Sequence, residues 1–369
     1  MLRILLLVAL ALAITHFTVP LAYYFYLKRF FKGSFEPMHR GGDKPLISIV
    51  IPTYNEAGLI REKLDNIYEQ SYPREKIEVV IMDSGSSDGT AEIAEEWARA
   101  HRDINLRIIR EPLRRGKAYA LNEALKHVSG EIIVITDADS KWVNRDALER
   151  VVAYMSDPGI GALSCVKIPE KRNSPVVESV YRDFYNIVRV AESRVYSTPV
   201  FHGELAAFKK SVLREIGGFP TDIGSDDSHT ATLVAVRGLR AVVAEDIICS
   251  ESIPRVNYFL WRIRRAQHLI QHFAKSLKLL RRAPERFRFV LGAEIYLHLF
   301  NPWILFSATV LLVVLSLRGY ALAMITLILG LLLLVYKPYR TWVATQLFLV
   351  IAAIRNLWSR EIVWEKIPK

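Results

Sequence analysis

The sequence predicts an α/β domain with a parallel sheet, placed between apolar segments that are long enough to cross a membrane. Three observations support this prediction. Strand-like apolar runs alternate with helical patterns between Lys44 and Glu251, as expected for strands joined by crossover helices. Outside this region, apolar residues gather at the two ends of the 369-residue chain. Acidic residues follow two of the predicted strands, at the sheet edge where ligands of open α/β sheets bind.

The first segment, residues 1–31, is predicted to be a transmembrane helix. Leu2 to Leu27 is charged only near its start, and a hydrocarbon core needs about 20 residues. A cleaved signal peptide is the alternative, but this apolar run exceeds the usual length and no small-x-small cleavage site follows it. Three cations come next, Lys28, Arg29 and Lys32. By the positive-inside rule, the amino terminus lies outside and the middle of the chain in the cytoplasm.

Residues 44–251 are predicted to form the cytoplasmic α/β domain. Strands are expected at Ile47–Ile51, Val79–Met82, Leu106–Ile109 and Ile132–Thr136, and helices at Leu59–Glu69, Thr90–Ala100 and Lys117–Lys126. This alternation favours a parallel sheet with crossover helices. No GxGxxG motif follows the first strand, which disfavours a dinucleotide-dependent dehydrogenase.

Residues 252–288 combine basic and apolar side chains at helical spacing. The basic residues are Arg255, Arg262, Arg264, Arg265, Lys275, Lys278, Arg281, Arg282, Arg286 and Arg288. This pattern is typical of amphipathic helices that lie on anionic headgroups, and a solvated helix packed on the domain is the alternative. Because much of the net charge of +11 lies here, we expect an anionic membrane surface as a partner and no nucleic acid. No obligate protein partner is inferred.

Residues 289–336 are predicted to form a transmembrane hairpin. Its two apolar arms are Pro302–Leu317, which can be extended back to Phe289, and Tyr320–Tyr336. Only Arg318 and Gly319 separate the arms, and such a tight connection between long helices is typical of a hairpin.

The last segment, residues 337–369, begins with Lys337 and Arg340, which mark a return to the cytoplasm. Its apolar stretch, Thr341–Ile354, is short for a span, so we expect it to lie in the membrane interface. A fourth span is the alternative. The sequence thus predicts a multi-pass protein of the cell membrane with three spans and a cytoplasmic α/β domain.

Acidic residues occur at three positions along the domain, in the order Asp83, then Asp137 with Asp139, then Asp226 with Asp227. The first two groups follow predicted buried strands. Carboxylates placed there can hold a divalent cation, and the cation can neutralise a diphosphate. The third group lies in a turn-rich stretch, where a carboxylate can serve as a base. These features favour a nucleotide-dependent transferase.

The sequence around these residues resembles family 2 glycosyltransferases. Motifs similar to the nucleotide-binding half of that family are Ile49–Glu56, Asp83–Thr90, Gly116–Ala118 with Ala120–Asn122, and Asp137–Asp139. Motifs similar to the acceptor half of its cellulose-synthase-like branch are Gly203, Ile216–Phe219 and Ser225–Thr230. The resemblance covers about Pro45 to Gln271. It implies a GT-A fold, which is a Rossmann-like nucleotide-binding domain, in the cellulose-synthase-like or polyprenol-linked sugar transferase branch.

A divalent cation is expected at the second acidic group. The diphosphate that leaves a nucleotide sugar must be stabilised as its negative charge develops. Asp137 and Asp139, one residue apart at the end of a strand, can present oxygens to Mg²⁺ or Mn²⁺. The resemblance makes Asp139 the firmer metal ligand, and Asp137 either a ligand or a contact to the nucleotide. A pair of solvated carboxylates in a turn is the alternative without function.

The nucleotide is expected to bind near Asp83, whose carboxylate can accept hydrogen bonds from the base or ribose. A simple turn residue is the alternative for Asp83. The opposite wall is expected to consist of Pro52, Thr53, Tyr54 and Glu56, with the Tyr54 ring able to stack. Lys117 can place a cation near the donor, or it can be a solvated residue at the start of a helix.

Asp227 is the candidate general base. An acceptor hydroxyl is a weak nucleophile, and a carboxylate within hydrogen-bond reach can take its proton as the new bond forms. Attack opposite the leaving diphosphate inverts the anomeric carbon. Asp226 stands where the related motif has Glu, and it is expected to face the acceptor or to orient its neighbour. The alternative is that either residue caps the helix expected from Ser228 onward.

One motif departs from the processive members of the family. Those relatives carry Gln-x-x-Arg-Trp on an interfacial helix, and the matching stretch here is Trp261–Arg265. Arg264 retains the arginine, a good partner for diphosphate oxygens, whereas Trp261 and Arg265 do not match the ends of the motif. We therefore expect Arg264 and Arg265 to bind a charged acceptor, such as a polyprenyl phosphate or pyrophosphate.

The expected function is that of a membrane-bound, inverting, metal-dependent hexosyltransferase. It would move one hexose from a nucleotide sugar to a polyprenyl or dolichyl (pyro)phosphate-linked acceptor, in the biosynthesis of glycans, N-glycans included, or glycolipids. Scarce Cys and Met with abundant Arg and Glu is typical of a thermophile, which by analogy favours GDP-mannose. A small processive polysaccharide synthase of cellulose or hyaluronan type, using a UDP-sugar, is one alternative. An inactive nucleotide-binding membrane adaptor is another, but the intact Asp137, Asp139 and Asp227 argue against it.

Overall fold

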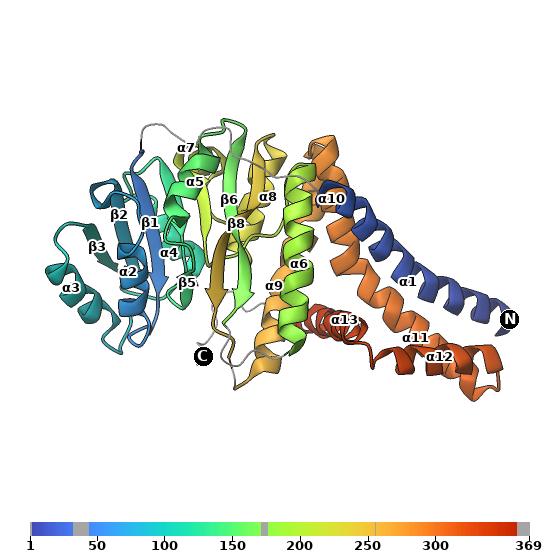
Figure 1. The fold of residues 1–369 in the computed structure, drawn as a ribbon. Coiled ribbons are helices and arrows are strands. Elements are labelled where there is room, and N and C mark those ends of the chain that lie inside the picture. Colours follow the sequence, from blue (N-terminus) through green and yellow to red (C-terminus); the bar gives the residue numbers. More distant parts are fainter. Residues whose placement is uncertain (1, 32–43, 171–175, 255, 360–369) are drawn as a thin grey trace.

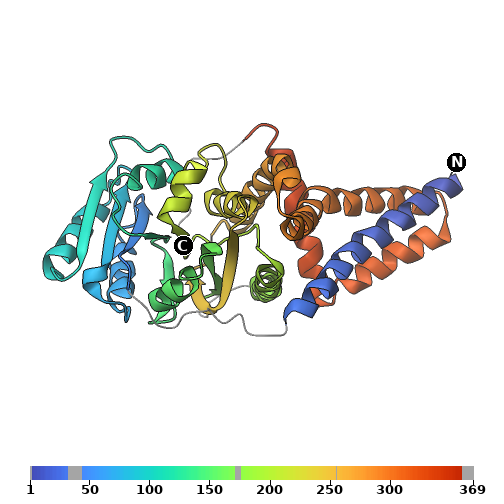
Figure 2. The same cartoon turned by 90° about the horizontal axis from the view of Figure 1, so that it is seen from above.

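The structure, a computed structural model, describes residues 2–31, 44–170, 176–254 and 256–359. Met1, Lys32, Arg255 and residues 360–369, on which some of the predictions fall, lie outside these ranges. An α/β domain forms one end of the molecule, and long apolar helices extend away from it (Figure 1). Seen from above, the amino-terminal end of the chain lies at the far tip of that extension (Figure 2).

The first half of the sheet agrees with the prediction. It consists of β1 (Ile47–Thr53), β2 (Ile77–Asp83), β3 (Asn105–Arg110) and β4 (Ile132–Ile135). These strands pair in parallel in the order β3-β2-β1-β4. The crossover helices are α2 (Ile60–Tyr68), α3 (Thr90–Ala100) and α4 (Lys117–Ala124).

The second half of the sheet corrects the expectation of a parallel sheet. It consists of β5 (Ser140–Trp142), β6 (Ile160–Pro169), β7 (Ala206–Lys209) and β8 (Arg240–Glu251). β7 runs antiparallel to β4 and β6, and β5 antiparallel to β8, while β6 and β8 are parallel. The reason is that the chain enters β7 where β4 ends, since Asp137 N donates to Gly203 O at 3.1 Å. From that edge β7 can only run back along β4.

Two apolar cores lie on the two faces of the sheet. Side chains alternate along a strand, so Ile49 and Ile51 of β1 enter one core and Val50 enters the other. Residues of α2, α3 and α5 (Ala147–Met155) cover the first face. The second is covered by residues of α4, α6 (Val176–Val195), α7 (Lys210–Ile216) and α8 (Asp226–Val236). The sheet is therefore the middle layer of three.

Among the residues that the structure describes, two helices are long and apolar enough to cross a membrane. The first is α1 (Leu2–Phe31). The second spans Glu285–Leu317 and consists of α10 (Glu285–Ile295), a π-helical turn and α11 (Asn301–Leu317), which agrees with the extension of the first hairpin arm to Phe289. Large apolar side chains are exposed along both helices, and such surfaces are typical of contact with lipid or protein.

The last two helices of the described chain do not form the straight second arm that was predicted for the hairpin. α12 (Ala321–Leu333) is shorter than the predicted arm Tyr320–Tyr336, and it meets α13 (Lys337–Arg355) at a bend of 108°. The pair passes as one candidate span only when its two helices are counted together, so the described residues contain two candidate spans, or up to three.

α13 lies at the boundary between the domain and the apolar helices (Figure 1). There it packs against α9 (Tyr258–Ser276), which is the predicted amphipathic segment. Ile263 and Ala266 of α9 share a small apolar core with Leu349 and Ala352 of α13. The two helices therefore pack on each other through apolar side chains, and their place in a membrane interface stays a prediction.

A buried charged cluster joins the apolar helices to the domain. Arg189 of α6 lies 2.9 Å from Glu192 and 3.0 Å from Glu294 of α10. Tyr23 of α1 donates a hydrogen bond to Glu192 at 2.7 Å. All four side chains are buried, so removing one partner would leave an uncompensated charge, which is strongly destabilising. The cluster therefore fixes α1 and α10 against the domain.

Candidate active site

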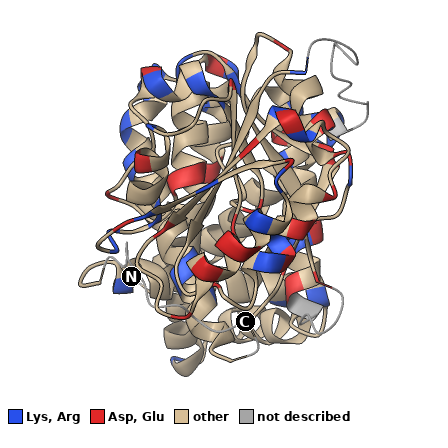
Figure 3. Cartoon of the chain, turned by 90° about the vertical axis from the view of Figure 1, so that its left-hand side faces the viewer, with Lys and Arg blue, Asp and Glu red and all other residues tan. Residues whose placement is uncertain are grey.

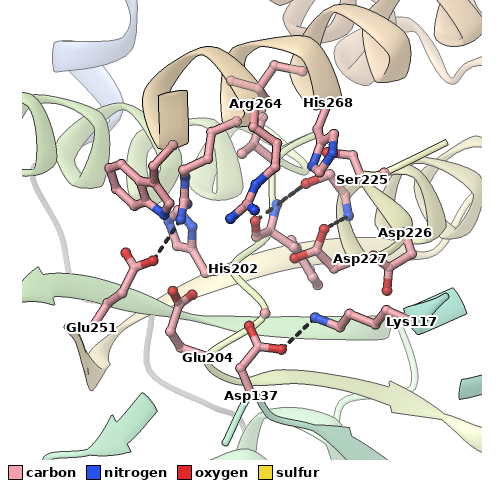
Figure 4. Close-up of a pocket in the computed structure, with 18 of the residues that line it drawn as sticks. Lys117, Asp137, His202, Glu204, Ser225, Asp226, Asp227, Glu251, Arg264 and His268 are labelled. Carbon is pink, nitrogen blue, oxygen red and sulfur yellow. Dashed lines mark hydrogen bonds and ion pairs between the residues drawn. The ribbon is translucent and has the colours of Figure 1, made fainter. Parts of the chain in front are cut away.

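One pocket opens at the carboxyl ends of β1 and β4 and reaches between α6, α9 and α13. It collects nearly all of the side chains that the sequence singled out. They are Pro52, Thr53, Tyr54, Glu56, Lys117, Asp137, Asp139, Asp226, Asp227, Arg264 and Arg265. Only Asp83 of the predicted residues is not among those that line it. Residues from separate parts of the sequence thus meet around one cavity (Figure 4).

Polar motif residues connect the loops that follow β1 and β2. Asn55 N donates to Ser86 Oγ at 2.9 Å, and Ser87 N donates to Asn55 Oδ1 at 2.9 Å. Glu56 N donates to Thr90 Oγ1 at 2.8 Å. Asn55 has a φ of 56°, a left-handed conformation that Asn adopts more readily than most residues. These bonds fix one rim of the pocket.

Asp83 lies just beneath that rim and is 3% exposed. Its carboxylate accepts hydrogen bonds from Thr53 Oγ1 at 3.2 Å and from Ser86 N at 3.1 Å. It therefore supports Thr53, which does line the pocket, and its contact with a nucleotide stays a prediction. Tyr54 carries the Arg114 guanidinium 3.8 Å from its ring centre, so one face of the ring is already covered by a cation.

Two other motifs form a reciprocal pair. Asn122 Nδ2 donates to Phe219 O at 2.8 Å, and Phe219 N donates to Asn122 Oδ1 at 2.8 Å. Gly217 and Gly218 approach this pair with φ angles of 84° and 81°, which side chains with a Cβ rarely adopt. The pair ties α4, which begins at Lys117, to the loop that leads to α8.

Lys117 faces Asp137 across the floor of the pocket (Figure 4). Its Nζ donates to Asp137 Oδ1 at 2.7 Å. Burial would lower the pKa of Lys117, but the carboxylates of Asp137, Asp226 and Asp227 outweigh it and raise that pKa. The ammonium therefore stays charged. Gly203 passes so close that a Cβ would stand 2.9 Å from both Asp137 Oδ2 and Lys117 Nζ, which explains why no side chain fits there.

The carboxylates of Asp137 and Asp139 suit a divalent cation only in part. Both line the pocket, and hard oxygen ligands are what Mg²⁺ and Mn²⁺ prefer. Within the described ranges, however, no group of three or more His, Cys, Asp or Glu side chains stands ready to hold a metal ion. The donor set therefore fits a cation that is shared with a ligand such as a diphosphate, which is how Mg²⁺ is commonly held.

Asp226 and Asp227 form the first turn of α8, so the helix begins two residues earlier than expected from Ser228. Ser228 N donates to Asp227 Oδ1 at 2.7 Å, and the positive end of the helix dipole favours both carboxylates. Burial and the neighbouring charge of Asp226 nevertheless raise the pKa of Asp227 to about 6. A carboxylate with such a pKa can take a proton and release it near neutral pH.

The loop before Asp226 rests on α9. Gly224 N donates to Gln271 Oε1 at 3.1 Å, and a Cβ at Gly224 would collide with the His268 ring. Lys275 forms an ion pair with Asp222 on the same loop. Three successive turns of α9 thus hold the loop that leads to the candidate base.

The far side of the pocket is a buried ionic network. Glu251 pairs with Lys167 and Arg182 at 2.9 Å and with Arg265 at 2.7 Å, while Glu178 pairs with Arg182 at 2.9 Å and Arg262 at 3.2 Å. Arg264 lines the pocket close by (Figure 4). The predicted pair of arginines is therefore present, but Arg265 already shares its charge with Glu251. Thr345, Phe348 and Leu349 of α13 continue the lining toward the apolar helices.

Several residues that line the pocket were not predicted from the sequence. They are Arg114, Tyr181, Arg182, Tyr185, Arg189, His202, Glu204 and Glu251. Most lie in segments without a recognisable motif, so only the fold brings them to the pocket. Glu204 follows directly on Gly203, and that adjacency was a signal that could have pointed to it. Seen from the end of the domain that lies away from the apolar helices, both basic and acidic residues are spread over the ribbon (Figure 3).

Comparison with known proteins identifies the family. Residues 48–217 match the sequence model of the family described as glycosyl transferase family 2. The structure superposes on the mannosyltransferase PcManGT of Pyrobaculum calidifontis, solved with GDP-mannose and Mn²⁺, with a TM-score of 0.87. The two sequences are 50% identical, over 96% of this chain and 99% of that one. This chain belongs to glycosyltransferase family 2. The predictions of a glycosyltransferase and of the GT-A fold are thereby confirmed.

More distant relatives agree with this assignment. Glycosyltransferase AglE of Haloferax volcanii is 30% identical over 205 residues, which are 55% of this chain and 66% of that protein. A poly-beta-1,6-N-acetyl-D-glucosamine synthase of Staphylococcus epidermidis is 26% identical over 243 residues, which are 63% of this chain and 57% of that protein. This chain spans less than two thirds of the length of either relative. TarS of S. aureus, with 17% identity and a TM-score of 0.52, shares the fold.

Proposed function

We propose that this family 2 glycosyltransferase is an inverting mannosyltransferase, which transfers one mannose from GDP-mannose to a lipid-linked acceptor at a membrane. The observation that carries the proposal is the meeting of Asp137, Asp139, Lys117 and Asp227 in one pocket. The similarity to a mannosyltransferase bound to GDP-mannose and Mn²⁺, at 50% identity, supports this sugar nucleotide and this type of cation.

The donor side of the pocket supplies positive charge for the leaving diphosphate. Asp137 and Asp139 would hold the Mn²⁺ or Mg²⁺, which neutralises the diphosphate as the glycosidic bond breaks. Lys117 adds a fixed ammonium beside Asp137, at 2.7 Å. Such preorganised charges stabilise the transition state because they need no rearrangement during the reaction.

The acceptor side supplies the base. Asp227 takes the proton of the acceptor hydroxyl as that oxygen attacks the anomeric carbon. It stands across the cavity from Asp137 in Figure 4, and attack from the side opposite the diphosphate inverts the anomeric carbon. Asp226, beside it, is 5% exposed and raises the pKa of that base.

The acceptor is proposed to be a polyprenyl phosphate or pyrophosphate that carries a sugar, whose hydroxyl gives its proton to Asp227. Arg264 and the buried network around Arg182 and Arg265 gather cations where its phosphate would lie, and arginine suits phosphate oxygens. Beyond them the pocket is lined by Phe348 and Leu349 of α13, toward the apolar helices. We further propose that those helices make the protein a multi-pass membrane protein with its catalytic domain in the cytoplasm.

A small processive polysaccharide synthase is the second candidate. The similarity to a poly-beta-1,6-N-acetyl-D-glucosamine synthase, at 26% identity, favours it. A processive synthase would use a UDP-sugar and make long products, so one assay distinguishes it from a mannosyltransferase.

Purified protein in detergent or nanodiscs would be incubated with dolichyl phosphate lipids that carry a sugar, and with radiolabelled GDP-mannose, UDP-glucose or UDP-N-acetylglucosamine. We expect transfer from GDP-mannose, dependent on Mn²⁺ or Mg²⁺, with loss of activity in excess EDTA and in the Asp139→Ala variant. Transfer from a UDP-sugar alone would favour the synthase. Full activity in EDTA would refute the metal assignment, and nucleotide binding without turnover would favour the inactive adaptor.

A further inference from the structure

Glu204 occupies a central position in the pocket that the steps above leave without a role. It follows Gly203, where a Cβ would stand 2.9 Å from both Asp137 Oδ2 and Lys117 Nζ, so it lies next to the place proposed for the diphosphate. Figure 4 shows its carboxylate between those of Glu251 and Asp137. Its negative charge also contributes to the raised pKa of both Asp137 and Asp227, so it stands near both of them.

The two oxygens of this carboxylate have different surroundings. Oε1 receives an ion pair from the buried ammonium of Lys167 at 2.6 Å. Oε2 is buried and, among the residues that the structure describes, it has no hydrogen-bond partner. The side chain is 3% exposed, so water does not solvate it freely. A buried charged oxygen without a partner is costly, which indicates that a ligand supplies the missing donor.

The chemistry of that ligand follows from the charges around it. A phosphate is excluded at Oε2, because it would face Glu204 and the neighbouring Asp137 with charge of the same sign. A protein-held metal ion is not favoured, since the described residues offer no group of three or more ligating side chains. What remains is a neutral group that donates hydrogen bonds, and the hydroxyls of a hexose are such groups.

The position selects the hexose of the donor. The sugar of a nucleotide sugar is attached to the diphosphate, and its anomeric carbon must lie between the diphosphate and the base. In the proposed function, Asp137 marks the place of the diphosphate and Asp227 is the base. Glu204 lies near both of these carboxylates. We propose that Glu204 Oε2 accepts a hydrogen bond from a hydroxyl of the transferred hexose and so selects the sugar, while Lys167 fixes the carboxylate in place. This inference rests on the proposed function.

The test separates binding of the sugar from binding of the nucleotide. Dissociation constants of GDP and GDP-mannose, and of UDP and UDP-glucose, would be measured by calorimetry on the full chain in detergent with Mn²⁺. For Glu204→Gln we expect unchanged affinity for the nucleoside diphosphate and an affinity for the sugar nucleotide that is about 10- to 100-fold weaker, as for loss of a charged hydrogen bond. Glu204→Ala should show at least the same loss.

Glu178→Gln is the matched control. Glu178 belongs to the same buried network, through Arg182 and Arg262, but it does not line the pocket. The same change of charge there should leave the ratio of the two dissociation constants as in the wild type. If Glu178→Gln lowered the preference for the sugar nucleotide as much as Glu204→Gln does, the effect would come from damage to the network and the inference would fail.

Deoxy analogues identify the hydroxyl. Among the mono-deoxy forms of GDP-mannose, we expect one that binds to the wild type about 10-fold or more weakly than GDP-mannose does. This analogue should bind to the wild type and to Glu204→Gln with equal affinity, because the missing hydroxyl and the substitution remove the same hydrogen bond. Equal affinity of wild type and Glu204→Gln for every sugar nucleotide would overturn the inference and leave the proposed function standing. A large loss of affinity for Mn²⁺ alone in Glu204→Gln would make Glu204 a metal ligand and also overturn it. A wild-type protein that binds no sugar nucleotide would overturn both.

Discussion

At the scale of single residues, the proposed reaction depends on carboxylates whose surroundings differ. Asp137 is paired with Lys117 at 2.7 Å, which suits a role at the diphosphate. Asp227 lies beside a second carboxylate and has its pKa raised to about 6, which suits a base. The same residue type can serve two purposes because burial and neighbouring charge set its proton affinity.

The Asp227→Asn variant tests this assignment. The amide keeps the shape of the side chain but accepts no proton, so donor binding should persist while turnover falls on the order of 10²- to 10⁴-fold. In the wild type, kcat/KM should decrease below pH of about 6, because Asp227 takes up a proton there and the base is lost.

The control is the shape of the pH profile in the variant. Asp227→Asn should lose the decrease near pH 6 that its carboxyl causes, and keep only its low, flatter activity. A near-wild-type rate for Asp227→Asn would move the base elsewhere, with Asp226 as the next candidate.

At the scale of elements, the helix α9 carries part of the candidate active site. His268 and Gln271 contact the loop at Gly224, and Arg264 faces the pocket from the same helix. On its other side α9 packs against α13 through Ile263 and Leu349. A shift of either helix would therefore reach the proposed base within a few residues.

Gly224→Ala tests the contact between loop and helix. The new methyl group would collide with the His268 ring, so either the loop or the helix must move. A displacement of about 1 Å at a catalytic group can cost on the order of 10² in rate, so we expect a large loss of kcat with nucleotide affinity retained.

Gly58→Ala is the matched control, since a Cβ there meets no atom within 4 Å. It should leave both turnover and nucleotide affinity close to the wild type. Equal activity of Gly224→Ala and Gly58→Ala would show that the contact does not position the base.

At the scale of the whole molecule, the pocket joins the nucleotide-binding half of the sheet to the apolar helices. A processive enzyme needs a surface on which a neutral glycan can slide, which stacking on an aromatic ring provides. Trp261 cannot offer that surface here, because it is 1% exposed and the Arg265 guanidinium lies 4.9 Å from its ring centre. Cations at this place bind phosphate well and neutral glycan poorly.

We therefore expect the enzyme to add one sugar in each encounter. With donor in large excess over acceptor lipid, mass spectrometry should show a dominant product that is one hexose heavier. The reason is that Arg265 stands where processive relatives carry the stacking tryptophan, and a cation there retains a neutral glycan poorly. A ladder of long products that forms while most acceptor remains unused would contradict this expectation and support the synthase.

The sequence by itself determined the nature of the chain and much of its site. The spacing and the number of apolar residues are local properties of a sequence. They were therefore sufficient to predict the strands β1, β2 and β4, the helix Thr90–Ala100 and the apolar ends. The acidic groups could be located because strand ends in parallel sheets meet at one edge.

The tertiary structure alone decided which distant residues share that pocket. β7 runs antiparallel because the chain enters it at the end of β4, and this direction brings Glu204 beside Asp137. Lys167, Arg182 and Glu251 come together from three different elements as a buried ionic network. Such contacts depend on the packing of segments far apart in the sequence, and no local pattern encodes them. The positions of the acidic residues at the ends of the strands were therefore predictable, whereas the residues that surround them in the pocket were not.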